Sequence, residues 1–365
     1  MCSVFHTRVF FDFVFSREVP ADSYEDLLSK GYFRLADIIF CSRYIVYDRT
    51  ISSLLHIRVP LDEFKAKKSY RRILNKVESR FTVNICRAET IDQMQHLYEL
   101  FKERLSGFIL QSISSLALDD DDHEGFETWS VQVYDGDKMI ACSFFDRCDT
   151  AVAGVFAMHH PDYNEFGLGN YTLLKEILFS QEEGHEFYYP GYVLDNSERF
   201  HYKTRFKPLQ QMNQQGQWSE FQPPVKVSDG TIQQIEIFES IEKSLNENKI
   251  PFRKKLNPFF TMGYELPEMG KFITGLVIFE IDQGLVIEYD SRKSTYRLAE
   301  VKPFEDYHRL FKAEIINTDY YRRDECYLQH PLVYEGKSRN SKTLNGILTE
   351  LALRQKNTDS VTDLS

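Results

Sequence analysis

The segment from residue 151 to residue 189 constrains the fold of this chain more than any other. It predicts a strand at Ala151–His159, a Gly167-Leu168-Gly169 turn, an amphipathic helix at Asn170–Glu183 and a short strand at Phe187–Tyr189. Apolar residues three and four positions apart give this helix its buried face. A glycine turn that leads into a helix directs free N–H groups at an anion. The sequence therefore predicts a strand–turn–helix–strand unit with an anion-binding turn.

The preceding segments predict the rest of a sheet. Trp129–Tyr134 and Lys138–Phe145 flank Asp135-Gly136-Asp137, which is a strong hairpin signal. Phe81–Cys86 alternates as a strand does, and Ile91–Leu105 has the apolar spacing of a helix, which a second helix at residues 109–118 would extend. This order is that of the GNAT acyltransferase fold, an α+β fold whose mixed sheet carries helices on both faces. In that fold the glycine turn binds the pyrophosphate of coenzyme A.

The chain is long enough for more than this one domain. It has 365 residues, of which 42% are hydrophobic. We expect an N-terminal α/β transferase region with a basic segment at 1–80 and a GNAT-like acyltransferase domain at 81–212. A small C-terminal α+β extension at 213–335 and a polar tail at 336–365 would follow. Residues 210–230, rich in Gln, Pro, Ser and Gly, are predicted to be a connector.

Charge and cysteine content exclude several classes of protein. The net charge of -11 argues against a general nucleic-acid coat. The six cysteines contain no C-x-x-C pair, so we expect neither a metal site nor a disulfide framework. The N-terminus lacks a basic region before its apolar residues, and no apolar run approaches the roughly 20 residues of a membrane span. We therefore expect a cytoplasmic protein without a membrane partner.

One segment has a positive net charge, although the chain as a whole is acidic. Residues 63–80 carry seven basic side chains and two acidic ones. Such a run is either a solvated helix face or a surface that binds nucleic acid. A second basic segment, residues 200–208, alternates Lys203, Arg205 and Lys207 with aromatic residues, so an extended conformation would place the three cations on one face. The alternative is an edge strand that charge protects from pairing.

Several segments between about residues 10 and 210 resemble the aminoacyl-tRNA–protein transferases, the arginyl- and leucyl-transferases of the N-degron pathway. YEDLLSKGYFRLADIIF is similar to their segment of helix, Gly-aromatic-Arg and strand. The next two segments are LLHIRVPLDEFKAKKSYRRILNK and LGNYTLLKEI with YYPGYVLDNSERFHYKTRFKPL. These place family residues at Arg58, Pro60, Phe64, Lys68, Ser69, Arg71, Arg72, Leu168, Gly169, Tyr171, Tyr189, Gly191, Tyr192, Tyr202, Lys203, Phe206 and Pro208. The cysteine cluster that the family carries near its N-terminus is not present here, where Cys41 stands almost alone.

The resemblance implies transfer of an amino acid from charged tRNA to the N-terminal α-amine of a protein. The tRNA ester is already activated, so the site must position the amine, accept a proton and stabilise an oxyanion. Asp195, Glu198 and Glu176 are candidate bases, and surface ion pairs are the alternative role for each. Tyr171, Tyr189 and Tyr192 would either stack on the terminal adenine or pack in the core.

We therefore expect three catalytic residues: Tyr192, Asp195 and Lys203. The residues expected to bind substrate and tRNA are Arg58, Lys68, Arg71, Arg72, Gly167, Gly169, Tyr171, Tyr189, Tyr202, Arg205 and Lys207. Charged tRNA is the co-substrate and no other cofactor is expected. Two alternatives stay open: a GNAT acyltransferase that uses acetyl-CoA, and a non-catalytic relative that binds tRNA or protein N-termini. The sequence does not decide which amino acid is transferred.

Overall fold

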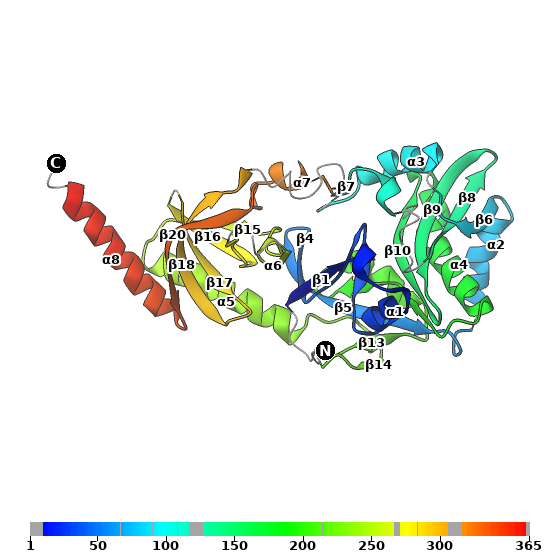
Figure 1. Cartoon of the computed structure of the whole chain (residues 1–365), viewed down its shortest axis with the longest axis horizontal. Helices are drawn as coiled ribbons and strands as arrows, with labels where there is room; N and C mark the ends of the chain where they lie inside the picture. Colours follow the sequence, from blue (N-terminus) through cyan, green and yellow to red (C-terminus); the bar gives the residue numbers. More distant parts are fainter. Residues whose placement is uncertain are drawn as a thin grey trace. The chain divides into compact units, whose positions relative to one another are not determined.

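The protein is described from a computed structural model, in which residues 10–65, 67–89, 91–107, 109–116, 127–213, 215–265, 271–282, 284–305, 316–317 and 319–362 are placed (Figure 1). The chain divides into two compact units. The first unit comprises residues 1–43, 53–226 and 314–317, and the second comprises residues 44–52, 227–313 and 318–365. The four-part division expected from the sequence stays a prediction.

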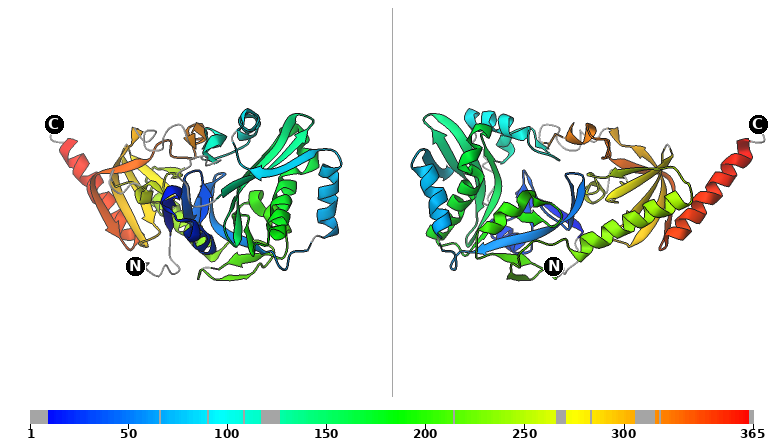
Figure 2. Two further views of the ribbon diagram at one scale, coloured as in Figure 1. Left: turned by 45° about the vertical axis from the view of Figure 1, so that its right-hand side comes forward. Right: turned by 180° about the vertical axis from the view of Figure 1, so that it is seen from behind.

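A large mixed sheet organises the first unit (Figures 1 and 2). Its strands follow the order β14 (Trp218–Glu220), β13 (Gln210–Met212), β5 (Thr50–Pro60), β11 (Phe187–Tyr189), β10 (Ala151–His159), β9 (Lys138–Arg147), β8 (Glu127–Asp135) and β6 (Thr82–Arg87). A further short strand, β12 (Tyr192–Leu194), also pairs with β5. Strands β10 and β11 are parallel, whereas the pairs β6–β8, β8–β9 and β9–β10 are antiparallel. A parallel pair needs a crossover, and α4 (Leu168–Glu182) supplies it.

Helices cover both faces of this sheet. Leu174 and Ile177 of α4 pack with Val152, and α2 (Lys68–Glu78) lies on the same face. On the other face, α3 (Asp92–Lys102) packs against Phe144, which precedes the α4-facing Phe145. Because neighbouring residues of one strand point to opposite faces of a sheet, α3 and α4 lie on opposite faces. The expected α+β, GNAT-like architecture is therefore confirmed, including the order of strand, helix, hairpin, strand, glycine turn, helix and strand.

An N-terminal layer covers the α3 side of the sheet next to β10 and β11. It consists of the antiparallel sheet β1 (Phe11–Phe15), β3 (Ile38–Ser42) and β2 (Phe33–Leu35), together with α1 (Ala21–Ser29). The side chains of Tyr24 and Leu28 pack against Ala153 and Tyr189.

A buried ion pair anchors this layer. Arg34 of β2 makes two hydrogen bonds to the carboxylate of Asp146 on β9, at 2.7 and 2.8 Å, and both side chains are fully buried. The hydroxyl groups of Tyr24 and Thr128 also donate to Asp146. Because each buried charge has a partner, the pair fixes the position of the layer against the sheet instead of destabilising it.

The second unit is a five-stranded antiparallel sheet with two long helices. The sheet order is β15 (Arg253–Leu256), β16 (Val277–Asp282), β17 (Leu285–Asp290), β18 (Thr295–Pro303) and β20 (Leu332–Ser341), with α5 (Asp229–Glu247) and α8 (Leu344–Thr362). The strand β4 (Tyr44–Tyr47), which pairs with β5, also belongs to this unit. Arg297 is paired with Glu288 and Asp290 inside it. Among the described residues no helix is long and apolar enough to cross a membrane.

Three local predictions are wrong. Residues 109–116 form β7 (Ile109–Leu110) and the 3-10 helix η2 (Ile113–Leu116) instead of a second helix, because Leu110 accepts a hydrogen bond from Tyr98 and pairs with β19 (Ile316–Asn317). The connector at 210–230 contains the hairpin β13–β14. The segment expected to be extended at 200–208 is mostly η4 (Glu198–Arg205), a 3-10 helix that Ser197 caps. Its three cations therefore do not share one face.

Candidate active site

The parallel strands β10 and β11 separate soon after they meet. They pair at only three positions, the last of which joins Ala153 to Tyr189. Beyond this point β10 continues to His159 and is irregular between Gly154 and Phe156, whereas β11 ends at Tyr189. The gap between the two strands opens where the N-terminal layer covers the sheet, and it contains a pocket.

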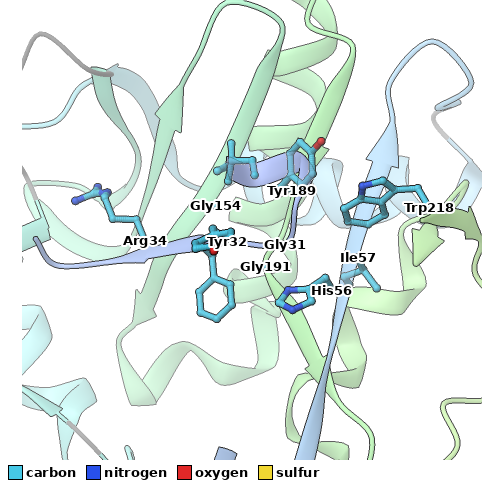
Figure 3. A pocket seen from close by; sticks show the side chains of 12 residues that line it. Gly31, Tyr32, Arg34, His56, Ile57, Gly154, Tyr189, Gly191 and Trp218 are labelled. Atoms are coloured by element: carbon cyan, nitrogen blue, oxygen red, sulfur yellow. The ribbon is translucent and has the colours of Figure 1, made fainter. Parts of the chain in front are cut away.

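The pocket is narrow, and aromatic residues and glycines make up most of its lining (Figure 3). Its walls include parts of α1, the loop after it, β2, β5 and the two separating strands. The lining residues are Leu28, Gly31, Tyr32, Phe33, Arg34, His56, Ile57, Ala153, Gly154, Tyr189, Gly191 and Trp218. Its interior is about 10 Å³, which is the space of one water molecule. A substrate group can therefore occupy the pocket only if lining side chains move apart.

The pocket carries no net charge. Burial lowers the pKa of His56 to about 4, so its imidazole is neutral at physiological pH. The guanidinium of Arg34 is compensated by Asp146. The residues that line the pocket include no carboxylate. A neutral side chain therefore fits the lining better than a charged one does.

A buried lysine lies directly behind Gly191. Nζ of Lys203 donates hydrogen bonds to the carbonyl oxygens of Pro190, at 2.7 Å, and Tyr192, at 3.5 Å. A Cβ atom at Gly191 would lie 3.5 Å from this Nζ. Burial lowers the pKa of Lys203 to about 8, and the charge of Glu176 opposes this shift. Lys203 therefore still carries its proton at neutral pH, next to the wall of the pocket.

A buried acid lies behind the second glycine of the wall. The hydroxyl of Tyr188 donates a 2.5 Å hydrogen bond to Oε2 of Glu176, and both side chains are almost fully buried. A Cβ atom at Gly154 would lie 2.6 Å from the Tyr188 hydroxyl and 3.2 Å from Oε2 of Glu176. Burial raises the pKa of Glu176 to about 7. Only the backbone of Gly154 thus stands between the pocket and an acid–base pair on the α4 side of the sheet.

Three of the predicted site residues hold the walls of this pocket. Asp195 is buried and accepts the backbone N–H of Ser53 at 2.7 Å, which ties the end of β12 to β5. Arg58 lies over the rings of Phe187 and Trp218, at 3.8 and 4.5 Å, and donates to the hydroxyl of Tyr189. Tyr189 itself lines the pocket.

Two of the predicted tyrosines lie near the lysine and one does not. The rings of Tyr192 and Phe200 lie 5.7 and 5.3 Å from Nζ of Lys203. Tyr202 neighbours Lys203 in η4 and is half-buried. Tyr171, in contrast, is fully buried and donates to Glu78, so its ring packs in the core.

The predicted anion-binding turn lies at the start of α4. Gly167 adopts a left-handed conformation with φ 65°, and no side chain caps the helix there. Space is open around a Cβ atom at Gly167, and at Gly169 such an atom would have one neighbour, 3.9 Å away. The helix begins two residues earlier than expected, so Leu168 and Gly169 belong to α4 and only Gly167 precedes it; none of the three residues lines the pocket.

The remaining predicted cations form a surface of their own. The hydroxyl of Tyr70 on α2 donates to the carbonyl of Arg205 and accepts from the N–H of Lys207, so the end of η4 lies against the start of α2. Five exposed side chains result, which we call the basic surface: Lys68, Arg71, Arg72, Arg205 and Lys207. Lys203 does not belong to it, because its side chain is half-buried and its Nζ donates to the carbonyl of Pro190.

Sequence reasoning named Glu176 among its candidate bases but missed Gly154, Tyr188 and His56. One signal was available for Gly154, because an isolated glycine inside a strand often marks a bulge or a close approach. No pattern pointed to His56, whose burial depends on the N-terminal layer. Glu198, another candidate base, belongs to the first turn of η4 and is exposed.

Residues 64–213 match the protein family described as "Arginine-tRNA-protein transferase, C terminus". The chain is also similar to curated proteins named "Aspartate/glutamate leucyltransferase". That of Campylobacter jejuni subsp. jejuni serotype O:2 is 22% identical over 204 residues, which are 54% of this chain and 82% of the relative. That of Vibrio vulnificus is 25% identical over 201 residues, which are 53% of this chain and 81% of the relative.

Two solved structures are similar to part of the chain, at low TM-scores. The crystal structure of FemX has a TM-score of 0.34 and 11% identity, and covers 58% of this chain and 70% of its own. The structure of L-PGS from Bacillus licheniformis has a TM-score of 0.32 and 14% identity, and covers 42% of this chain and 56% of its own. The family match and the curated relatives make residues 64–213 similar to the aminoacyl-tRNA–protein transferases, which are acyltransferases.

Proposed function

We propose that this protein transfers an uncharged amino acid, of the leucyl type, from charged tRNA to the N-terminal α-amine of a protein. The observation that carries the proposal is the pocket at the gap between β10 and β11, with Lys203 behind one glycine and Glu176 with Tyr188 behind another. No cofactor other than the charged tRNA is required. These substrates place the protein in the cytoplasm.

Lys203 is the group suited to stabilise the oxyanion of the tetrahedral intermediate. Its ammonium has three N–H donors, and in the described part of the chain two are directed at the carbonyls of Pro190 and Tyr192. The third is free to approach a substrate oxygen beside Gly191. A buried cation acts more strongly on such an oxygen than a solvated one, because the surroundings screen its charge less.

The neutral lining of the pocket supports the choice of amino acid. An arginyl side chain would bury its guanidinium among Tyr32, His56, Ile57 and Trp218 without a carboxylate in the lining. Burial of an unpaired charge costs roughly several kcal/mol of free energy. Burial of a leucyl side chain in the same environment is favourable, because its apolar surface leaves water. The curated relatives carry the name leucyltransferase, which agrees with this choice.

The basic surface supports the assignment of the two macromolecular substrates. Its exposed cations, among them Arg71, Arg72 and Lys207, are suited to the phosphates of the tRNA acceptor arm. The names of the relatives suggest an acceptor whose first residue is aspartate or glutamate. We therefore propose acidic N-termini as acceptors.

The test is transfer of radiolabelled amino acid to short peptides by the full chain. Leucyl-tRNA and arginyl-tRNA are each offered with peptides that begin with Asp, Glu, Arg or Ala. We expect label from leucyl-tRNA on the acidic peptides. Transfer from arginyl-tRNA alone would overturn the choice of amino acid. Absence of transfer from any charged tRNA, together with saturable acetyl-CoA turnover, would overturn the function and favour the acetyl-CoA alternative.

A further inference from the structure

We propose that Tyr188 and Glu176 are the proton acceptor of the transfer reaction, the tyrosine hydroxyl meeting the attacking amine and the glutamate receiving the proton behind it. This inference rests on the proposed function. It assigns a role to two residues of α4 and β11 that lie behind the pocket wall and do not line it.

The geometry of Gly154 carries the inference. Gly154 lines the pocket from β10, and the space where its side chain would stand lies 2.6 Å from the Tyr188 hydroxyl. Any larger residue would displace that hydroxyl or close the approach to it. A substrate group that enters the gap between β10 and β11 therefore reaches the Tyr188 hydroxyl only past the backbone of Gly154, and reaches Glu176 only through Tyr188.

The position of Glu176 on α4 argues against a purely structural role. The buried residues of α4 next to it include the apolar Leu173 and Ile177. The buried hydroxyls of Thr172 and Ser180, one turn to either side, donate to backbone carbonyls and not to the Glu176 carboxylate. Burying a carboxylate in such a place is costly, and an apolar residue of similar size would be more stable there. Only hydrogen bonds and the nearby charge of Lys203 compensate it.

The groups that face Glu176 come from three other elements. Ser143 and Cys142 approach from β9, Tyr188 from β11, and Tyr202 and Lys203 from η4. Desolvation by burial raises the pKa of Glu176 to about 7, although the hydrogen bond from Tyr188, the nearby hydroxyl of Ser143 and the charge of Lys203 all act to lower it. A base with this pKa is close to the range where proton transfer from an amine is most effective at neutral pH.

The step balances without a further reactant. The amine nitrogen attacks the ester carbon, a C–N bond forms and the carbonyl electron pair moves to oxygen, next to Lys203. The amine N–H proton passes to the oxygen of Tyr188 as the tyrosine proton passes to Glu176. When the intermediate collapses, the bond from carbon to the ribose oxygen breaks, and the proton returns through Tyr188 to that oxygen. Glu176 is then ionised again.

The test compares Glu176→Gln and Tyr188→Phe with two matched controls in the full chain. Glu182→Gln changes an exposed glutamate of the same helix. Tyr98→Phe removes the hydroxyl of another buried tyrosine, which donates to the carbonyl of Leu110. Each variant is assayed with leucyl-tRNA and an Asp-initiated peptide between pH 5.5 and 8, after its urea midpoint has shown that it folds.

We expect both test variants to lose kcat by about 10²- to 10³-fold while KM for each substrate stays within about twofold, since general-base catalysis contributes on this scale. In the wild type and both controls, kcat should rise with pH through a midpoint near 7, and Glu176→Gln should abolish that rise. An active wild type whose rate and pH profile survive in Glu176→Gln and Tyr188→Phe would overturn the relay and leave the proposed function intact. A wild type that transfers no amino acid would instead overturn the proposed function.

Discussion

Nζ of Lys203 donates a hydrogen bond to the carbonyl oxygen of Pro190, 2.7 Å away in the turn between β11 and β12, and the lysine side chain is half-buried. This contact gives Lys203 surroundings different from those of Lys207, which lies four residues later in the sequence and is exposed. The two lysines belong to the same short segment but have different surroundings, so their substitution should have different consequences.

Replacement of Lys203 by methionine should reduce the rate of transfer without weakening tRNA binding. The buried ammonium is positioned for an oxyanion, and loss of one such donor lowers kcat by about 10²- to 10³-fold. Lys207→Met should do the reverse, because its charge is available to phosphate. Filter binding of charged tRNA and single-turnover transfer measure the two effects. A reduced salt dependence of binding in Lys203→Met would contradict the assignment.

Gly154→Ala should inactivate the protein while its fold survives. The new methyl group would stand 2.6 Å from the Tyr188 hydroxyl, so that hydroxyl must move away from the pocket. We expect a loss of at least about tenfold in kcat and a decrease of about 1–3 kcal/mol in the free energy of unfolding, which is typical of overpacking. Gly169→Ala is the control for stability, since its methyl group would meet only one atom, at 3.9 Å. Full activity in Gly154→Ala would show that the hydroxyl position is unimportant.

Removal of one partner of the buried pair Arg34–Asp146 should destabilise the first unit strongly. Both side chains are fully buried, so either Arg34→Met or Asp146→Asn leaves a charge without compensation. Breaking such a pair costs about 3–5 kcal/mol. The double variant Arg34→Met with Asp146→Asn should cost less than the sum of the two single changes. Urea midpoints followed by tryptophan fluorescence give the comparison, and additive losses would show that the two residues are not coupled.

The stability of the protein should fall as pH rises through the range set by Glu176. Its pKa is raised by burial from 4.5 to about 7 in the folded state, so between these values the folded protein holds more protons than the unfolded chain. The stabilisation is therefore complete below about pH 4.5 and is lost as pH approaches 7 and beyond. Glu176→Gln should remove this slope. The difference in urea midpoint between wild type and variant, measured from pH 5 to 7.5, checks the sign, and a difference that does not depend on pH would refute it.

The sequence predicted those elements whose limits are set locally. β10 and β11 were predicted with the bounds they have, because each is an apolar run that ends at a polar residue, proline or glycine. The helix α4 was predicted at Asn170–Glu183 but spans Leu168–Glu182, because the left-handed Gly167 starts it two residues earlier. The family motifs also led to Lys203 and Tyr192, because each belongs to a contiguous pattern.

The parts that could not be predicted depend on contacts between distant segments. The alternation in residues 200–208 suggested a strand, but Tyr70 binds the backbone at Arg205 and Lys207, and the burial of Lys203 favours a compact turn. The environment of His56 likewise depends on Gly31 and Phe33, which approach it from the N-terminal layer. Such contacts leave no periodic pattern in the sequence.

The basic surface should account for much of the salt dependence of tRNA binding. Arg71 and Arg72 are exposed on α2, and each charge that neutralises a phosphate releases a counterion, which adds about 0.9 to the slope of log K against log salt. Arg71→Ala with Arg72→Ala should therefore lower the slope by about 1–2 and weaken binding of any tRNA, charged or not. Because the change is remote from the pocket, kcat at saturating tRNA should stay within about twofold of the wild type. Lys243→Ala, an exposed lysine of α5 in the second unit, is the control and should leave the slope unchanged. An unchanged slope in the double arginine variant would show that the tRNA backbone lies elsewhere on the molecule.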